Sequence, residues 1–439
     1  MSKLKLYPHQ QAALEKTKDQ NKVAYYLDMG LGKTFVGSEK MMQLDTNINL
    51  LICQKSKIND WIDHFTEFYE LSDDIMIYDL TKWKADDWKV FDQDPQFKED
   101  SHGKLKYVLV INYELAFRRK LSELRNFTLI LDESSMVQNE TAKRTKFILN
   151  KLHPINTILL SGTPTSGKYE NLYSQIKMLG WNISKDLYWK QYIDYEWVEN
   201  GKFFRCQVNG YKNVDRLKQK LRDHGAVFMK SEEVFDLPSQ NFNKIWIPST
   251  KEYKKFIKHK IISIEDDTGN LIQLIGDTTL NHMLYSRMLC GQYCRDKFNA
   301  FEDLLNSTED RLIVFYNFTN ELDRLSDICK NYKRPISIVN GKTKDLNEYE
   351  QHDNSITFVQ YQAGAMGLNL QKANKIIYYT LPLSSELFEQ SKKRIHRIGQ
   401  EKPCFYYYLM CKNTIEEKIL KTLEIRRDYT DELFKEEIR

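Results

Sequence analysis

The sequence predicts an α/β fold with parallel sheets flanked by helices, built in two halves along the chain. Short apolar runs alternate with segments whose apolar residues recur at helical spacing, a pattern typical of βαβ units. A glycine-rich segment joins the first apolar run to a helical pattern, and the second half repeats the alternation without such a segment. A chain of 439 residues is too long for one ordinary core, so two or three domains are expected.

The glycine-rich segment is a candidate phosphate-binding loop. The apolar run Val23–Leu27 leads into Gly30, Gly32, Lys33 and Thr34, and a helix over residues 35–44 follows. Converging backbone N–H groups and the positive end of the helix favour an anion there. Lys33 would reach the β- and γ-phosphates, and the Thr34 hydroxyl would bind Mg²⁺. A leucine replaces the first glycine of the usual pattern, so a tight glycine turn before an ordinary helix is the alternative.

A helix is expected before this loop, and a strand and a helix after it. The first, over residues 4–20, carries Gln10, whose amide suits a bidentate contact to an adenine edge. A glutamine on the protein surface is the alternative, and this segment taken alone favours it. A buried strand over 49–53 and a helix over 58–68 follow the loop. Residues 70–104 are polar and predict an irregular connection with a short strand at 75–78, before a strand at 107–112 and a helix at 117–124.

Two acidic residues form the second chemical feature. Asp132 and Glu133 end an apolar run that starts at Phe127, so they lie at the carboxyl edge of a buried strand, where open α/β sheets bind ligands. Asp132 can hold Mg²⁺ through water, and Glu133 can polarise the water that attacks a γ-phosphate. Acidic pairs also cap strand ends, but a phosphate loop about 100 residues upstream favours the catalytic interpretation.

A further strand over residues 157–160 runs into Ser161–Pro164, a hydroxyl-rich turn that can bond the acidic strand end and a neighbouring domain. Residues 172–238 are partly helical, with a hairpin expected near 199–208. Their aromatic residues belong either to the core, which is favoured, or to a surface that contacts bases or sugars: Tyr188, Trp189, Tyr192, Tyr195 and Trp197. A basic helix over 251–260 is expected to be a connector.

The second half predicts strands at 311–316, 336–339, 356–361 and 375–379, with helices at 321–330 and 345–351. Near its end, Arg394 and Arg397 are three residues apart and would share one face of a helix. Two guanidinium groups suit a triphosphate, because planar bidentate donors stabilise charge on the transferring phosphoryl group. A basic face in solvent is the other interpretation.

Composition excludes few functions. The net charge of +4 is too mild to show a nucleic-acid partner. No apolar run approaches the ~20 residues that span a bilayer, and the first residues lack the apolar core of a signal peptide, so a cytoplasmic protein with no membrane partner is expected. Seven dispersed cysteines favour a reducing compartment. Cys290 and Cys294 with His282 could be metal ligands, but their spacing favours core thiols on one helix face.

Basic residues cluster in three places, and each cluster is either a solvated face or a phosphate contact. The clusters are Lys143/Arg144/Lys146, Lys254/Lys255/Lys258/Lys260 and Lys392/Lys393/Arg394/Arg397.

These segments together resemble the motifs of Swi/Snf-type ATPases in helicase superfamily two, over nearly the whole chain. His9-Gln10, Met29–Thr34 and Leu51–Trp61 are similar to the glutamine motif, motif I and motif Ia. Asp132–Ser135 and Ser161–Pro164 match motifs II and III. Further segments resemble motifs IV, V and VI: Arg311–Phe318, Ala363–Leu370 and Arg394–Gln400.

The resemblance implies two RecA-like lobes with ATP between them and double-stranded DNA bound across both. Residues 1–245 would form the ATP-binding lobe with a helical insertion after 165, residues 246–285 a connector, and residues 286–439 the second lobe. Lys33, Thr34, Asp132 and Glu133 would bind and hydrolyse Mg-ATP. The other implied residues are Gln10 on adenine, Gly30, Gly32 and Gly367 at the nucleotide, and Arg394 and Arg397 as arginine fingers.

Some segments depart from the family pattern, namely Ser134-Ser135, Gln54-Lys55 and Thr380–Ser384, so the details of DNA contact and coupling stay open. We expect a DNA-stimulated ATPase, acting as a monomer in a bacterial or phage setting, that moves along double-stranded DNA and displaces what is bound there. Single-stranded DNA and a replication or recombination protein are alternative partners. Two rival functions are a strand-separating helicase and an adaptor that uses ATP as a switch to recruit a partner.

Overall fold

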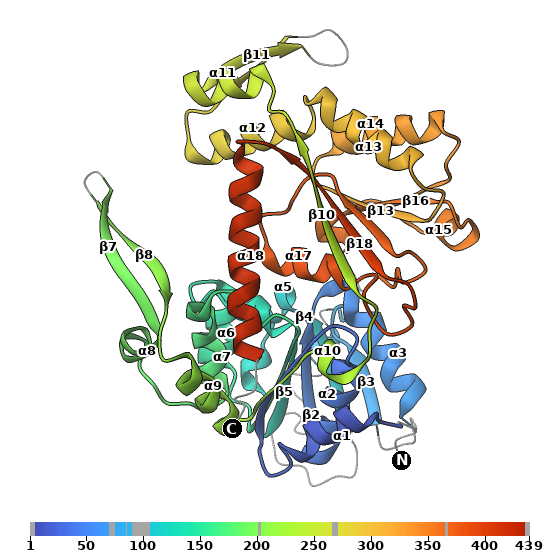
Figure 1. The fold of residues 1–439 in the computed structure, drawn as a ribbon. Coiled ribbons are helices and arrows are strands. Elements are labelled where there is room, and N and C mark those ends of the chain that lie inside the picture. The colour runs from blue at the N-terminus through green and yellow to red at the C-terminus, as the bar shows by residue number, and fades with distance from the viewer. Residues whose placement is uncertain are drawn as a thin grey trace. The chain divides into compact units, whose positions relative to one another are not determined.

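The computed structural model describes residues 5–69, 75–84, 86–89, 106–200, 203–265, 271–364 and 368–434 (Figure 1). The chain forms two compact units. The first unit comprises Met1–Phe235 and Asp428–Arg439, and the second comprises Asp236–Arg427. The division therefore falls before residue 245, because residues from 240 onward form a strand of the second sheet. Residues 246–285, predicted as a connector, fall within the second unit, and the end of the last helix belongs to the first unit.

The first unit is built on a seven-stranded sheet in the order β3-β4-β2-β5-β6-β1-β9, with every pairing parallel. Its strands are β1 (Lys22–Leu27), β2 (Ile48–Cys53), β3 (Ile75–Asp79), β4 (Lys106–Asn112), β5 (Phe127–Asp132), β6 (Asn156–Ser161) and β9 (Ala226–Met229). Alternate residues of β1 enter different cores: Tyr26 packs on one face, and Tyr25 and Leu27 on the other. Both faces are therefore covered, which is why these strands are continuously apolar.

Helices on both faces complete this unit: α1 (Pro8–Glu15), α2 (Lys33–Leu44), α3 (Ile58–Phe68), α5 (Tyr113–Ala116), α6 (Lys143–Lys151), α7 (Tyr173–Met178), α9 (Val214–Asp223) and α10 (Ser231–Val234). α3 has the expected bounds, whereas α1 is shorter than the predicted 4–20. The helix expected at 117–124 is wrong. The chain there forms α5 before residue 117 and a 3-10 turn at Leu121–Glu123, where Leu121 is buried in the core.

A helix and a long hairpin form the insertion. α8 (Lys185–Tyr192) continues directly into β7 (Ile193–Asn200), which pairs with β8 (Phe203–Tyr211), and the two strands extend away from α8 in Figure 1. Tyr188 and Tyr192 are fully buried, whereas Trp197 is 64% exposed. The favoured core assignment therefore holds for the aromatic residues of α8 and not for the one on the outer hairpin.

The second unit contains another seven-stranded sheet, in the order β10-β18-β17-β13-β16-β14-β15. Its strands are β10 (Gln240–Ile247), β13 (Leu312–Tyr316), β14 (Ile336–Val339), β15 (Lys344–Asp345), β16 (Ile356–Gln360), β17 (Lys375–Tyr378) and β18 (Cys404–Cys411). All pairs are parallel except β14 with β15. The predicted strands of the second half are all present, and two apolar cores again cover the two faces of this sheet.

The helices of the second unit are α11 (Lys251–His259), α12 (Thr279–Gly291), α13 (Arg295–Asn306), α14 (Thr319–Asn331), α15 (Asn347–Gln351), α16 (Tyr361–Gly364) and α17 (Ser385–Lys392). A two-stranded hairpin, β11 (Ile261–Glu265) with β12 (Leu271–Ile275), packs on α11 through the buried Ile264 and Leu274. The long α18 (Ile415–Phe434) begins in the second unit. Its last turns bind within the first unit, where the Tyr169 hydroxyl donates to the Tyr429 carbonyl at 2.8 Å.

Candidate active site

Three chain segments meet at the carboxyl edge of the first sheet. β6 lies between β1 and β5, with Tyr26 opposite Ser161 and Asp132 opposite Leu160. Since all three strands are parallel, the loop after β1, the acidic end of β5 and the Ser161–Pro164 turn lie at one edge of the sheet. The three segments that the sequence singled out in the first half are thus neighbours in space.

The loop after β1 has the geometry of a phosphate cradle. Gly30 and Gly32 have φ angles of 90° and 76°, in the left-handed region that side chains disfavour, and α2 begins at the next residue. The Lys33 ammonium donates to the Leu27 carbonyl at 3.1 Å, so the side chain folds back over the loop. A Cβ on Gly162 would lie 3.4 Å from the same Nζ, which places Lys33 between the loop and the turn after β6.

Gln10 and its helix hold this loop in place. The Gln10 amide accepts from the Tyr7 backbone N–H at 2.9 Å and donates to the Leu31 carbonyl at 3.1 Å. The side chain is buried, which excludes the surface alternative. A cavity of about 580 Å³ opens beside it, lined by Tyr7, Pro8, His9, Ala12, Lys16, Phe228, Met229, Glu233, Val234 and Phe235. Aromatic walls of this kind suit a planar base, since π faces stack on one another.

The acidic residues at the end of β5 are fixed by several hydrogen bonds. Asp132 Oδ1 accepts from the Glu133 N–H at 3.0 Å, and Asp132 Oδ2 accepts from the Trp61 indole at 2.9 Å. The Tyr113 hydroxyl donates to the Asp132 carbonyl at 2.8 Å, and burial, together with these carboxylates, raises the pKa of Tyr113 well above its ordinary value. Glu133 has a φ of 52°, which turns its side chain out of the strand direction.

These donors fit a hydrated magnesium ion. Mg²⁺ prefers oxygen ligands and keeps several of its waters. A carboxylate has about four acceptor positions, so Asp132 retains capacity for a metal-bound water beyond these two hydrogen bonds. The Thr34 hydroxyl in the first turn of α2 would be the second oxygen donor. The Lys33 ammonium is a positive charge of the kind that a triphosphate requires.

A buried glutamine connects the acidic segment to the turn after β6. The Gln175 amide accepts from the Ser134 hydroxyl at 2.8 Å and donates to the Pro164 carbonyl at 2.8 Å. It also accepts from the Tyr26 hydroxyl at 3.0 Å. The predicted contact between the acidic segment and the turn is therefore made in two ways. Gln175 of α7 bonds both, and the Gln138 side chain, just after the acidic segment, donates directly to the same Pro164 carbonyl at 3.1 Å. Nothing local in the sequence marks Gln175, Tyr113 or Trp61 for these roles, because each partner is distant along the chain.

The arginines of the second unit are placed differently from the prediction. α17 ends at Lys392, so Arg394 and Arg397 lie in the turns that follow it and do not share a helical face. In these turns the side chains of Ile395 and His396 are both buried together with that of Arg394, which a continued helix with one inward face would not allow. Arg394 is 1% exposed and donates to the Leu368 carbonyl at 3.2 Å, whereas Arg397 is half-buried and donates to Asn369.

The third basic cluster is not a solvated face. Lys392 and Arg394 are buried, and the Lys392 ammonium lies 4.4 Å from the Phe388 ring centroid and 2.6 Å from Glu389. Burial lowers the pKa of Lys392 and of Arg397. Gly367, the remaining nucleotide residue that the resemblance implied, lies outside the described residues.

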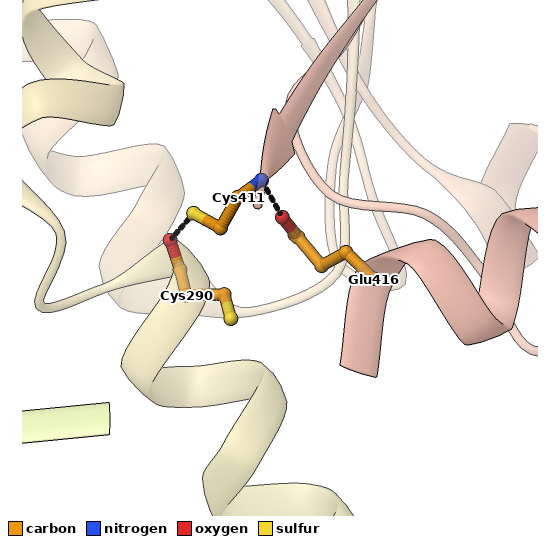
Figure 2. A group of neighbouring side chains, drawn as sticks. All are labelled: Cys290, Cys411 and Glu416. Carbon is orange, nitrogen blue, oxygen red and sulfur yellow. Dashed lines mark hydrogen bonds between the residues drawn. The ribbon is translucent and has the colours of Figure 1, made fainter. Parts of the chain in front are cut away.

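The thiols of Cys290 and Cys294 are buried in the core as predicted, but they come from separate elements and not from one helix face. Cys290 lies in α12 and Cys294 directly before α13, so they do not share one helix face, and the Sγ atom of Cys294 lies 3.9 Å from that of Cys411. The ligand atoms of Cys290, Cys411 and Glu416 lie within 4.8 Å of one another, and Figure 2 shows Cys411 bonded to the Cys290 carbonyl through its thiol and to the Glu416 carboxylate through its backbone N–H. Cys411 is the last residue of β18.

Glu416 is already bonded through both carboxylate oxygens, to the Cys411 N–H at 2.8 Å and to the Lys297 ammonium at 2.5 Å. Burial alone would lower the pKa of Lys297, but the neighbouring Glu416 raises it above its ordinary value. The cluster is therefore best explained as core thiols around a buried ion pair, as favoured from the sequence.

Two protein-family models match the chain. The SNF2-related domain matches residues 23–298, and the helicase conserved C-terminal domain matches residues 296–399. The chain belongs to the SNF2-related family. The resemblance read from the motifs is thereby confirmed, and the two units are the two RecA-like lobes of this family. Family membership makes the chain an ATP hydrolase with a helicase-like core.

Curated relatives of this SNF2-related protein are distant and longer. A SWI/SNF-related regulator of chromatin, subfamily A member 1, from Mus musculus is 24% identical, over 91% of this chain and 40% of its own length. The ISWI chromatin-remodeling complex ATPase ISW1 of Saccharomyces cerevisiae is 24% identical, over 93% of this chain and 39% of its own. An uncharacterized ATP-dependent helicase of Mycoplasma genitalium is 24% identical, over 94% and 40%. This chain spans about 40% of the length of these relatives.

Among solved structures, the SWI2/SNF2 ATPase core of Sulfolobus solfataricus in complex with double-stranded DNA matches with a TM-score of 0.44 and 17% identity, covering 98% of this chain and 93% of that one. In the part of this chain that the structure describes, every helix is too short or too polar to cross a bilayer.

Proposed function

We propose that this SNF2-related chain is a DNA-dependent ATPase that moves along double-stranded DNA and displaces protein or nucleic acid bound to it. The observation that carries the proposal is the convergence of the phosphate loop, the Asp132–Glu133 pair and the Ser161–Pro164 turn at one sheet edge, in a chain whose family is established. The names of the relatives, which include chromatin-remodeling ATPases and a helicase, support a nucleic-acid partner.

In this proposal each residue of the first unit has one task. The backbone N–H groups of the loop and the Lys33 ammonium bind the triphosphate, and Gln10 keeps the loop in its bound shape while the aromatic cavity receives the base. Mg²⁺, held by Thr34 and through water by Asp132, would neutralise charge on the β- and γ-phosphates. Glu133 accepts a proton from the attacking water.

The second unit would contribute Arg394 and Arg397 when the two units close on ATP. Guanidinium groups stabilise the charge that develops on the transferring phosphoryl group, and a requirement for closure would couple hydrolysis to movement along the duplex. The half-buried Arg397 is the better placed of the two to reach outward, since Arg394 is almost fully enclosed. We place this activity in the cytoplasm of a bacterium or a phage-infected cell, with the protein acting as a monomer.

A pair of displacement assays tests the proposal against its rivals. ATP-driven release of a triplex-forming strand from an intact duplex is expected, together with little unwinding of a forked duplex. Unwinding of the fork without triplex displacement would instead identify a strand-separating helicase. ATP binding without displacement in either assay, and without turnover, would identify an adaptor that uses ATP as a switch.

A further inference from the structure

Trp61 contacts the acidic segment directly. It lies in α3, is 1% exposed, and its indole N–H donates to Asp132 Oδ2 at 2.9 Å. The other carboxylate oxygen accepts from the Glu133 N–H at 3.0 Å. The Asp132 carboxylate is therefore held from two sides, once by its own chain segment and once by a helix 71 residues earlier in the sequence.

A buried indole generally needs an acceptor, so this bond alone would be compatible with simple anchoring of Trp61. The same helix makes a second contact that argues for more. His64, one turn after Trp61, has its Nε2 2.8 Å from the Ser38 hydroxyl of α2, the helix that begins with Lys33 and Thr34. Residues three apart lie on one helical face.

One face of α3 is thus bonded to both elements that would hold the metal. His64 bonds the phosphate-loop helix, which carries Thr34, and Trp61 bonds the strand end, which carries Asp132. The Tyr69 hydroxyl, just after α3, donates to the same Ser38 hydroxyl at 2.9 Å. α3 thus connects the helix that carries Thr34 to the strand end that carries Asp132, and the Trp61 N–H is one of two donors to the Asp132 carboxylate.

We infer that Trp61 is a positioning residue for magnesium: its indole N–H sets the orientation in which the Asp132 carboxylate would accept from a metal-bound water. The inference rests on the proposed function, because it assigns a role within the same ATP site. Groups that orient metal ligands typically change metal affinity 10- to 100-fold when they are removed. Loss of the N–H should therefore weaken Mg²⁺ binding without removing any group that contacts the nucleotide.

The test is a Mg²⁺ titration of the binding of a fluorescent, non-hydrolysable ATP analogue, which reads equilibrium binding without turnover. Trp61→Phe keeps an aromatic ring and loses the donor. We expect its half-saturating Mg²⁺ concentration to rise at least about 10-fold, with unchanged affinity for the analogue when Mg²⁺ is absent. Metal-free binding reports whether the site is folded.

Trp189→Phe is the matched control, because the indole nitrogen of Trp189 is buried with no hydrogen-bond partner among the described residues. Its Mg²⁺ dependence should equal that of the unmodified protein. If Trp61→Phe does not fold, benzothienylalanine at position 61, which replaces the N–H by sulfur in the same shape, removes the donor alone.

If the half-saturating Mg²⁺ concentration of Trp61→Phe lies within about twofold of that of the unmodified protein, the inference is overturned. An equal rise of this concentration in Trp61→Phe and Trp189→Phe would also overturn it. Failure of the unmodified protein to bind the analogue at any Mg²⁺ concentration would instead overturn the proposed function.

Discussion

Replacing Gly32 by alanine should damage nucleotide binding through the neighbouring Gln10. The Cβ of an alanine would lie 2.1 Å from Gln10 Nε2, too close for any contact, and the φ of 76° is a conformation that alanine disfavours. A left-handed residue other than glycine costs about 1–2 kcal/mol. Displacing the amide from the Leu31 carbonyl costs about 0.5–1.5 kcal/mol more.

The two terms add to about 1.5–3.5 kcal/mol, or about 10- to 300-fold in affinity at 1.4 kcal/mol per tenfold change. Without nucleotide, the loop of the variant can avoid both energetic costs by adopting another backbone conformation. Nucleotide binding then has to restore the strained conformation, so the costs appear as lost affinity. Equilibrium binding of a fluorescent ATP analogue measures the loss directly. Gly341→Ala is the matched control, because among the described residues, apart from its two chain neighbours, none has an atom within 4 Å of its Cβ position. The affinity of this variant for the analogue should not change.

An affinity of Gly32→Ala within about threefold of the unmodified protein would refute this reasoning, since it would show that the loop does not need the observed backbone shape to bind phosphate. A large loss of affinity in Gly341→Ala would show that the loss in Gly32→Ala is not specific to the loop.

Four further predictions concern the proposed site and the residues that support it. Lys33→Ala should abolish ATP binding, as measured by equilibrium binding. Glu133→Gln should still bind ATP but hydrolyse it at least about 100-fold more slowly, as measured by phosphate release. Rapid hydrolysis by Glu133→Gln would show that Glu133 is not the base. Arg397→Ala should keep ATP affinity while losing DNA-stimulated turnover, and full stimulation in that variant would show that the arginine assignment is wrong. Burial lowers the pKa of His64 to about 4, so between that value and its unfolded pKa the unfolded chain binds the proton and the folded chain does not. The free energy of unfolding of the first unit should therefore fall by about 2–3 kcal/mol as the pH drops from about 6.5 to 4, and urea unfolding of His64→Gln should show a flatter pH dependence.

Much of the fold was predictable because strongly periodic segments determine their own structure. α3 has the predicted bounds, and β2, β5 and β13 lie where apolar runs were seen, since a strand buried on both faces must be continuously apolar. The candidate phosphate loop and the Asp132–Glu133 pair could be singled out because the residues of each are close together in the sequence. Because β1, β6 and β5 are neighbouring parallel strands, the loop and the acidic pair lie at the same edge of the sheet.

The errors occurred where tertiary contacts override local pattern. The segment at 117–124 has helical spacing but forms a 3-10 turn around the buried Leu121. The turns after Lys392 are set by the burial of Ile395 and His396, which a helical extrapolation could not include. Trp61 and Gln175 were not assigned roles because their partners, Asp132 and Pro164, are brought to them only by the folded sheet.

The most direct test of the central claim is steady-state ATP hydrolysis measured in parallel without nucleic acid, with single-stranded DNA, with double-stranded DNA and with RNA. The account predicts slow turnover alone and strong stimulation by double-stranded DNA, lost in Glu133→Gln. Turnover that does not rise with any DNA would contradict the proposal that this ATP site drives movement along a duplex.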